Sequence, residues 1–256
     1  MISVIIPNYN GKKYLSKCIS SIPKDIQIIL VDNNSGDKSQ NIRREGLKLI
    51  QNKANLGFAK AVNIGLPNVK TNFVLILNSD TILDKNWFLE LKKNISEHPG
   101  YFCYCGTIYK QDGDIENTGF VFKMSGKAEL RKSTMEGKIW GSPATACVYE
   151  TKKLKQLSGF DESYFAYIED VDLHYRANKL GFETYYSKDL KCQHYGGGSA
   201  GKDSLFRAKN TFKNWFVFIK NNYSSKEIFN NLAGIIIERL KNFKYLMYCF
   251  INDNRH

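Results

Sequence analysis

The chain has 256 residues, 43% of them hydrophobic, and a formal net charge of +12. That apolar content suffices for one large domain, or one domain with an appendage, and the charge favours a polyanionic partner: nucleotide phosphates, an anionic membrane or nucleic acid. No apolar stretch reaches the roughly 20 residues needed to cross a bilayer, and the first residues lack the regions of a signal peptide. We therefore expect a cytoplasmic protein, neither exported nor membrane-spanning.

Six cysteines are scattered along the chain, and only Cys103 and Cys105 are close together. Their spacing suits neither a zinc ribbon nor a redox pair. We expect reduced thiols, as is usual in the cytosol.

Strands and helices alternate through the first hundred residues. Apolar runs predict strands at residues 3–7, 27–31, 47–51 and 73–77, and helices are expected at residues 12–21, 39–46 and 58–65. Short apolar strands separated by helices indicate a parallel sheet that is covered on both faces. Such sheets bind ligands at the carboxyl edge, where the sequence places its polar clusters: residues 8–10, 32–34, 52–57 and 78–80.

The remainder of the chain is less regular. We expect strands at residues 101–110, 119–122, 144–150 and 184–186, a mobile polar loop at 126–141, and a helix at 170–180 that Gly181 closes. Two further helices, at 205–221 and 226–252, are rich in aromatic residues and lysine. The sequence thus predicts a domain of residues 1–200, with halves at 1–100 and 101–200, and a basic helical extension of residues 201–256.

Two acidic residues follow predicted strands. Asp32 precedes a turn-like Asn33-Asn34 pair, and its carboxylate can accept the imide N–H of a uracil or thymine base or simply cap a turn. Asn78-Ser79-Asp80 offers hard oxygen ligands for a divalent cation between two phosphates, although this triplet is also prone to form turns.

A second acidic signature and a histidine lie further along. Glu169-Asp170 precedes a helix, where a carboxylate can take a proton from a hydroxyl group or cap the helix. His194 precedes three glycines, and neutral imidazole is a common metal ligand. Residues 196–201 formally match GxGxxG, but they do not lie between a first strand and its helix, so we expect no dinucleotide site there.

Taken in order, these motifs are more specific than any one alone. They are VIIPNYN at 4–10, ILVDNNS at 29–35, NLGFA at 55–59, LNSDT at 77–81, GFDE at 159–162, YF at 164–165, IEDVDL at 168–173 and HYGG at 194–197. With them the chain resembles a family-2 glycosyltransferase, especially the rhamnosyltransferase-like branch, over about residues 1–215.

The resemblance implies an α/β GT-A fold, a Rossmann-like and mostly parallel sheet with helices on both faces, and inversion at the anomeric carbon. It implies transfer of one sugar from a UDP-sugar or dTDP-rhamnose to a hydroxyl of a glycan acceptor, a lipid-linked intermediate of bacterial cell-surface polysaccharide. Asp80 and His194 would hold Mn or Mg, Asp170 would be the base, and Glu169 would contact the acceptor. The residues implied at the donor are Pro7, Tyr9, Asn10, Asp32, Asn34, Asn55, Gly57, Phe58, Asn63, Asn78 and Ser79.

The sequence departs from the family pattern at two places. The metal motif begins with Asn78 instead of Asp, which leaves Asp80 as the main carboxylate. Residues 143–146, Pro-Ala-Thr-Ala, replace a Gly-Ala-Cys run near the acceptor site of relatives. The identity of the acceptor is therefore the property that can least be inferred from the relatives.

Two other classes of function fit parts of the sequence. A processive polysaccharide synthase would carry membrane helices and a QxxRW motif, which this sequence lacks. A non-catalytic nucleotide- or nucleic-acid-binding protein would explain the positive charge, but it has no need for Asp80 and Asp170 at two sheet-edge sites. We expect no nucleic-acid partner.

The C-terminal extension leaves three interpretations open. Residues 202–256 contain ten Lys and Arg but four Asp and Glu, and their aromatic residues recur with helical spacing. Such helices can lie on an anionic membrane, pack on the core as a cap, or form a homodimer face.

Overall fold

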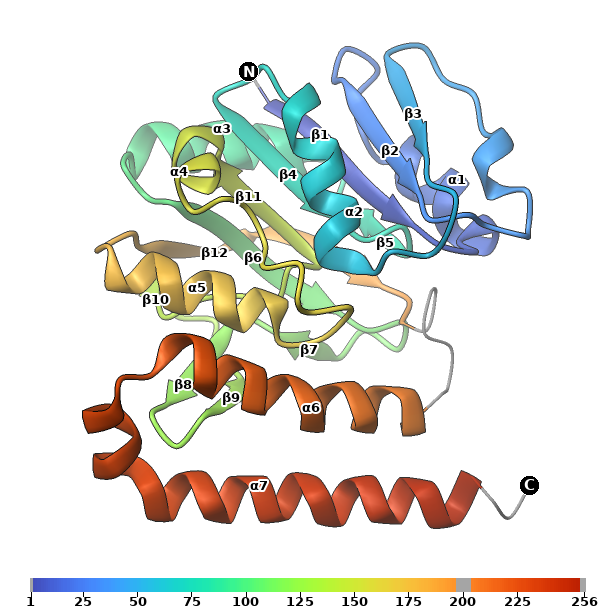
Figure 1. The fold of residues 1–256 in the computed structure, drawn as a ribbon. Coiled ribbons are helices and arrows are strands. Elements are labelled where there is room, and N and C mark those ends of the chain that lie inside the picture. Colours follow the sequence, from blue (N-terminus) through green and yellow to red (C-terminus); the bar gives the residue numbers. More distant parts are fainter. Residues whose placement is uncertain (1, 197–203, 254–256) are drawn as a thin grey trace.

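The computed structural model describes residues 2–196 and 204–253. Within these ranges one sheet of ten strands runs in the order β10-β12-β6-β11-β4-β1-β2-β3, with β5 beside β12 and β7 beside β6 (Figure 1). Its strands are β1 (Ile2–Asn8), β2 (Ile28–Asp32), β3 (Leu47–Gln51), β4 (Phe73–Leu77), β5 (Thr81–Leu83), β6 (Cys103–Tyr109), β7 (Ile115–Asn117), β10 (Gly137–Ile139), β11 (Ala146–Glu150) and β12 (Thr184–His194).

The N-terminal half of this sheet is parallel. β4, β1, β2 and β3 are neighbours and run in the same direction. Every residue of β2 is buried, because a strand covered on both faces is apolar throughout instead of alternating. The predicted parallel sheet is therefore confirmed. β11 then pairs antiparallel with β4 and β6, and β12 runs parallel to β6.

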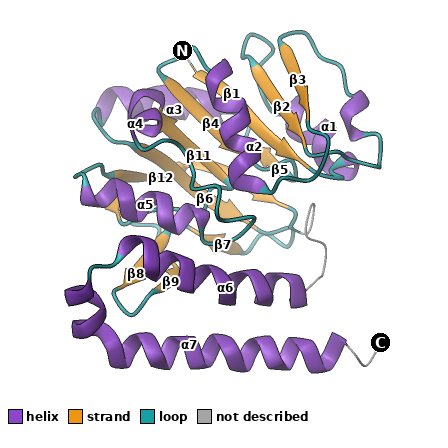
Figure 2. Ribbon diagram, in the orientation of Figure 1, coloured by secondary structure: helices purple, strands orange, loops and turns teal. Residues whose placement is uncertain are grey.

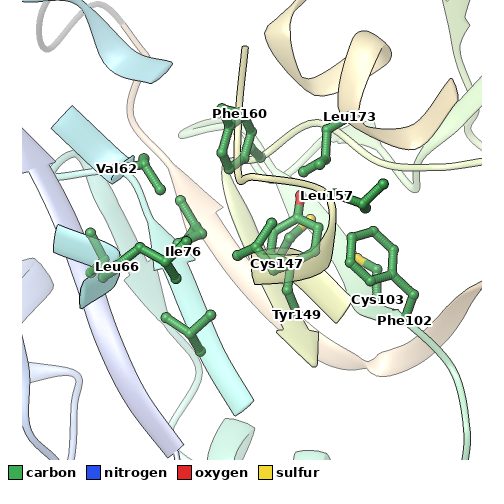
Figure 3. Close-up of a cluster of buried hydrophobic side chains, with 14 of the residues drawn as sticks. Val62, Leu66, Ile76, Phe102, Cys103, Cys147, Tyr149, Leu157, Phe160 and Leu173 are labelled. Atoms are coloured by element: carbon green, nitrogen blue, oxygen red, sulfur yellow. The ribbon is translucent and has the colours of Figure 1, made fainter. Parts of the chain in front are cut away.

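Helices cover both faces of the sheet (Figure 2). α1 and α3 contribute Leu15 and Trp87 to one buried cluster, and α2, α4 and α5 contribute Val62, Leu154 and Leu173 to another (Figure 3). This layering confirms the predicted α/β class. The helices are α1 (Lys12–Ser20), α2 (Phe58–Gly65), α3 (Trp87–Glu97), α4 (Thr151–Gln156), α5 (Glu169–Lys179), α6 (Ser204–Asn222) and α7 (Ser225–Asp253), with two short 3-10 turns, η1 (Ser39–Asn41) and η2 (Leu66–Asn68).

The C-terminal helices pack against the sheet domain. A separate hairpin, β8 (Phe120–Lys123) and β9 (Lys127–Leu130), lies beside α6 (Figure 1). Tyr175 of α5, Phe120 of the hairpin, and Trp215 and Phe218 of α6 share one buried cluster. α7 lies along the outer side of α6. The helical region at the C-terminus is thus confirmed, and the boundary predicted near residue 200 lies outside the described residues.

One predicted helix is wrong. The helix expected at residues 39–46 is the single turn η1, after which the chain is extended toward β3. Within that turn only Ser39 is buried, so the segment has no apolar face whose packing on the domain would stabilise a helix. The Arg44 guanidinium instead donates to the carbonyl of Ile19.

Two predictions about strands are also wrong. The loop expected at residues 126–141 contains β9 and β10, which pair with β8 and β12. The last strand does not stop at Tyr186 but continues to His194 through an irregular register. Both errors concern strands that are stabilised by hydrogen bonds to a partner strand. The local sequence alone does not specify that pairing.

The six cysteine thiols are free and buried, which agrees with the expected reduced state. Among the helices of the described residues, none combines the length and the hydropathy that crossing a bilayer requires.

Candidate active site

A cavity of about 810 Å³ opens at the carboxyl edge of the sheet. β1 and β4 run parallel, so the segments that follow them lie on this edge together. The loops before α2 and α5 and the end of β12 complete its walls. Predicted residues that line this cavity are Pro7, Tyr9, Asn55, Gly57, Phe58, Asn78, Ser79, Asp80, Glu169, Asp170 and His194.

Asp32 lies behind this lining. Its carboxylate is fully buried and accepts hydrogen bonds from Asn8 Nδ2 at 2.8 Å and from Ser35 Oγ at 2.6 Å. Asn10 and Asn34 both have positive φ, and Asn10 Oδ1 accepts the Gly36 N–H. These three predicted residues shape the loops after β1 and β2, and the cavity wall at this point is formed by Asn8 and Asn33.

The structure does not bring Asn63 to the cavity. Its amide donates to the carbonyl of Phe160 at 2.7 Å and accepts the Phe160 N–H at 3.0 Å. Asn63 lines a different hollow, with Glu162. It therefore fixes the Gly-Phe-Asp-Glu segment to α2.

Asp80 and His194 meet in the cavity wall. β12 pairs antiparallel with β5, which sets His194 opposite Thr81 and brings its Nε2 to 3.4 Å from Asp80 Oδ1. His194 Nδ1 lies 2.9 Å from Glu116 Oε2. Burial lowers the pKa of His194, but hydrogen bonds and negative charge from Asp80 and Glu116 outweigh burial and raise that pKa to about 10.

These groups fit a divalent cation if the cation displaces the proton that Asp80 and Glu116 hold on His194, because only the neutral imidazole binds a metal. Nδ1–H would then donate to Glu116 and Nε2 would face the cation. Metal–ligand bonds of about 2.1 Å set neighbouring ligands about 3 Å apart, close to the separation of Asp80 Oδ1 and His194 Nε2. Mg²⁺ commonly binds one or two protein groups and takes its other ligands from phosphates and water. Across the described ranges, no cluster of three or more His, Cys, Asp or Glu side chains is arranged to hold a metal by itself. A cation here would take its remaining ligands from water or from a phosphate-bearing ligand.

Glu169 and Asp170 begin α5 and face the same cavity. Asp170 accepts the N–H groups of Val171 at 2.8 Å and Ala144 at 3.4 Å. Burial raises the pKa of Asp170 to about 6. Burial, and then the charge of Asp170, raise the pKa of Glu169 well above its usual range, and Glu169 Oε2 has no hydrogen-bond partner among the described residues.

The turn before α5 has an uncommon backbone. Tyr167 and Ile168 both have positive φ, 71° and 72°, a conformation that is costly for a β-branched residue. Asn214 of α6 is buried and donates to the carbonyls of Ala166 and Tyr167, at 2.9 and 2.7 Å. α6 therefore fixes the turn that presents Asp170.

The other side of this turn contacts the loop before α2. Gly57 has φ of 83°, and a Cβ there would lie 2.2 Å from the Phe165 carbonyl oxygen. Phe58 N–H donates to that same oxygen at 2.8 Å. Glycine is therefore required where the two halves of the cavity wall meet.

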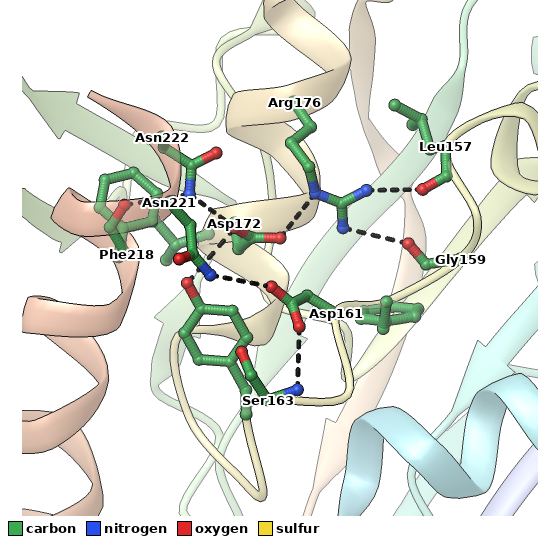
Figure 4. Close-up of polar contacts among 12 residues, drawn as sticks. Leu157, Gly159, Asp161, Ser163, Asp172, Arg176, Phe218, Asn221 and Asn222 are labelled. Carbon is green, nitrogen blue, oxygen red and sulfur yellow. Dashed lines mark hydrogen bonds and ion pairs between the residues drawn. The ribbon is translucent and has the colours of Figure 1, made fainter. Parts of the chain in front are cut away.

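Asp172 and Arg176 support α5 from behind (Figure 4). The Arg176 guanidinium pairs with Asp172 at 2.7 Å and donates to the carbonyls of Leu157 and Gly159. Asn222 of α6 donates to the other Asp172 oxygen at 2.7 Å. This network ties α4, α5 and α6 together, one turn below Asp170.

A family model described as "Glycosyl transferase family 2" matches residues 3–158. The chain belongs to this family. Glycosyltransferase GlyA of Streptococcus pneumoniae serotype 4 is 29% identical over 202 residues, which are 74% of this chain but 28% of GlyA. N-acetylglucosaminyl-diphospho-decaprenol L-rhamnosyltransferase of Mycobacterium tuberculosis is 22% identical over 265 residues, 88% of this chain and 85% of that protein.

Solved structures establish the fold. GalNAc-T7 with UDP, GalNAc and Mn²⁺ matches with a TM-score of 0.67 at 16% identity, over 86% of this chain and 47% of that one. S. aureus TarS 1-349 in complex with UDP-GlcNAc matches with a TM-score of 0.63 at 20% identity, over 94% and 72%. The predicted GT-A fold is confirmed.

Some cavity residues of this family-2 glycosyltransferase were not predicted from its sequence. Glu116 contacts His194 from β7, and nothing in its turn-like surroundings marks it. The hairpin, α6 and α7 also form cavity walls, although the sequence suggested a separate extension. They contribute Phe120, Lys127, Ala128, Leu130, Phe206, Arg207, Thr211, Trp215, Glu238, Arg239, Asn242 and Tyr245.

Proposed function

We propose that this protein is an inverting, metal-dependent glycosyltransferase that moves one sugar from a nucleotide-sugar donor to a hydroxyl of a glycan acceptor. The observation that carries the proposal is that Asp80 and His194 lie in the wall of the same cavity as Asp170 and Glu169. Asp80 and His194 are suited to the diphosphate of the donor. Asp170 and Glu169 are suited to the hydroxyl of the acceptor, to which the sugar is transferred.

The donor's nucleotide would occupy the part of the cavity that β1 and β2 border. Pro7, Tyr9 and Asn33 line it there, and Asn55 and Gly57 continue the wall toward α2. For the Asp32 carboxylate to accept a uracil or thymine imide N–H, the Asn8 and Asn33 side chains that form the cavity wall in front of it must move aside, because Asp32 is fully buried. A UDP-sugar or dTDP-rhamnose fits this proposal.

The chemistry follows from the ionisation of the two carboxyl groups. As the acceptor oxygen forms its bond to the anomeric carbon, the Asp170 carboxylate takes the hydroxyl proton, and the bond from that carbon to the diphosphate breaks. Glu169 keeps its proton to a higher pH than Asp170 does, and in its protonated form it can donate to the acceptor through its unpartnered carboxyl oxygen. Mn²⁺ or Mg²⁺, bound by Asp80 and His194, would offset the charge that gathers on the departing nucleoside diphosphate.

The acceptor is proposed to be a lipid-linked glycan intermediate of bacterial surface polysaccharide. The Mycobacterium tuberculosis relative is named for an acceptor in which a diphosphate joins sugar to decaprenol. A relative from Methanococcus voltae is named for a dolichyl phosphate sugar. Both names describe acceptors on a lipid phosphate.

An exposed face of α7 suits a membrane that carries such lipids. Phe229 is 79% exposed and Leu240 62%, and they belong to an apolar stripe along the helix. The stripe consists of Phe229, Leu232, Ile236, Leu240, Phe243, Met247 and Phe250.

Charge beside the apolar stripe favours an anionic lipid surface over a second copy of the chain. Lys226, Lys241 and Lys244 are exposed on the adjoining face of α7. Glu227 pairs with Lys179 and Glu238 with Lys241, so Lys226 and Lys244 are the lysines of this face without an ion pair among the described residues. Ile237 and Tyr248 extend the exposed apolar surface beyond the width of a coiled-coil seam. We therefore propose peripheral binding to the cytoplasmic face of the membrane.

A thermal-shift screen tests the proposed donor. Nucleotide sugars are added to the full chain with Mn²⁺, and the donor that stabilises it most is assayed for transfer. We expect a UDP- or dTDP-sugar to raise the melting temperature of the wild type with Mn²⁺, and to lose most of this effect in Asp80→Ala. Exposed Asp84→Ala is the matched control. An equal shift in Asp80→Ala would refute the metal-assisted donor site.

A further inference from the structure

Arg239, in the middle of α7, is a buried cation without an acidic partner. Its exposed fraction is 7%, and none of the ion pairs found among the described residues includes it. Its Nη2 donates to the carbonyl of Gly126, and its guanidinium lies 4.8 Å from the centre of the Trp215 ring. Nε and Nη1 have no hydrogen-bond partner. Two donors of a buried guanidinium are therefore left unused.

Unused donors on a buried charge call for an explanation. Burial without compensation destabilises a folded protein, and apolar residues of similar volume often stabilise the same position. Burial accordingly lowers the pKa of Arg239 to about 10. Such a group is accounted for when a ligand supplies the missing acceptors.

The surroundings of Arg239 belong to the cavity that contains Asp170. Lys127 of β9, Arg207 of α6 and Asn242 of α7 also line it, and Lys127 pairs with Glu129 at 2.6 Å. Glu238 lines it too, but Lys241 pairs with that carboxylate at 2.9 Å. Arg239 and Arg207 are therefore the cations of this wall that have no carboxylate partner among the described residues.

We propose that the part of the cavity around Arg239 is an anion subsite, in which Arg239 binds the phosphate or diphosphate of the acceptor substrate. The inference rests on the proposed function, because it takes the acceptor to be a phosphate-linked glycan. Guanidinium groups form charge-assisted hydrogen bonds to phosphate oxygens, and Arg207 adds a second positive charge to the cavity wall. The subsite would fix the lipid end of the acceptor while its hydroxyl reaches Asp170.

Binding of pyrophosphate to the full chain tests the subsite directly. Calorimetry in EDTA and low salt excludes a contribution from a cation at Asp80. We expect Arg239→Met to weaken binding about tenfold without lowering the melting temperature, because it removes an unpaired buried charge. Arg43→Gln, which removes an exposed guanidinium distant from α7, should bind as the wild type does. Arg239→Lys, which keeps the charge but loses donors, replaces the first variant if that one fails to fold.

Equal affinity of the wild type and the Arg239 variant would mean an adventitious ion only and would overturn the subsite. A second arm identifies the source of the anion. Acceptor KM is compared for a lipid-diphosphate saccharide and for the same saccharide as a neutral alkyl glycoside. We expect Arg239→Met to raise KM about tenfold for the first acceptor and not for the second. An equal rise for both would overturn recognition of the acceptor's phosphate.

The two proposals fail in different ways. Transfer to the lipid-diphosphate acceptor with unchanged KM in Arg239→Met would overturn the subsite and leave the glycosyltransferase function standing. Pyrophosphate binding that depends on Arg239, in a protein that transfers no sugar to any acceptor, would overturn the function and leave the anion site standing.

Discussion

Two adjacent carboxyl groups in the cavity ionise under different conditions. Asp170 accepts two backbone N–H groups, which favour its charged form, so burial raises its pKa only to about 6. Glu169 has fewer such contacts and lies beside the charge of Asp170, so its pKa is raised further. Glu169 therefore keeps its proton to a higher pH than Asp170, and this difference divides their proposed roles.

A pH profile follows from the ionisation of Asp170. A general base acts in its deprotonated form, so kcat/KM for the acceptor should rise with pH up to about 6 and then level off. Below the pKa we expect the rate to fall about tenfold per pH unit. Steady-state assays between pH 5 and 8, with donor saturating, measure it. A profile that is flat across this range would argue against Asp170 as the base.

The sequence indicated the residues with proposed chemical roles better than it indicated the residues that surround them. Asp80, Asp170 and His194 stood out because their motifs recur in a fixed order, and the structure brings them to one cavity. Glu116 and Arg239 had no such motif. Their positions depend on β7 pairing with β6 and on α7 packing along α6, which no local pattern encodes.

Among the elements, α6 matters most for the presentation of the base. It lies beyond the residues that the family model matches, yet Asn214 donates to both carbonyls of the strained turn before α5. Asn222 of the same helix donates to Asp172 within α5. α6 therefore acts on Asp170 through the backbone, as a positioning element.

The variant Asn214→Leu tests this positioning. It removes both hydrogen bonds while nearly keeping the volume, so we expect kcat to fall about a hundredfold while donor KM changes little. Asn210→Leu is the matched control, because Asn210 donates only to Phe206 within its own helix. A purely structural role predicts a lower melting temperature with unchanged kcat in the protein that remains folded, and that outcome would contradict the account.

The strands predicted correctly are those whose own sequence is a nearly continuous apolar run. β2 and β4 are continuous runs of Ile, Leu and Val, and both were predicted within a residue. β9 and β10 are polar and short, and they exist because β8 and β12 supply their hydrogen-bond partners. Residues 39–46 had helix-forming composition but no face to bury.

In the whole molecule, α7 lies between the cavity and the exposed surface that carries the apolar stripe. Its inner side carries Arg239 and Asn242 to the cavity, and its outer side carries the apolar stripe. A helix that contacts the cavity and a membrane at once would bring a lipid-linked acceptor to Asp170 without removing its lipid from the bilayer. The net charge of +12 favours an anionic leaflet.

Co-sedimentation with anionic liposomes tests the membrane face. The triple variant Ile236→Glu, Leu240→Glu and Met247→Glu should abolish sedimentation, because it puts charge on exposed positions of the stripe. Leu89→Glu with Leu180→Glu, two exposed leucines elsewhere, should sediment as the wild type does. A wild-type dimer that the triple variant converts to monomer, without liposome binding by either, would instead assign the stripe to a second copy of the chain.

We propose that Asp170 takes the acceptor's proton in a cavity where other residues bind the donor. Sugar transfer and calorimetric donor binding with Mn²⁺, compared between Asp170→Asn and the wild type, test this role. We expect transfer to fall about a thousandfold and donor affinity to stay within about twofold of the wild type, because the donor groups are untouched. The melting temperature at pH 7.5 should be no lower, since Asn removes a carboxylate whose burial is unfavourable when ionised. Substantial turnover in Asp170→Asn would contradict this role.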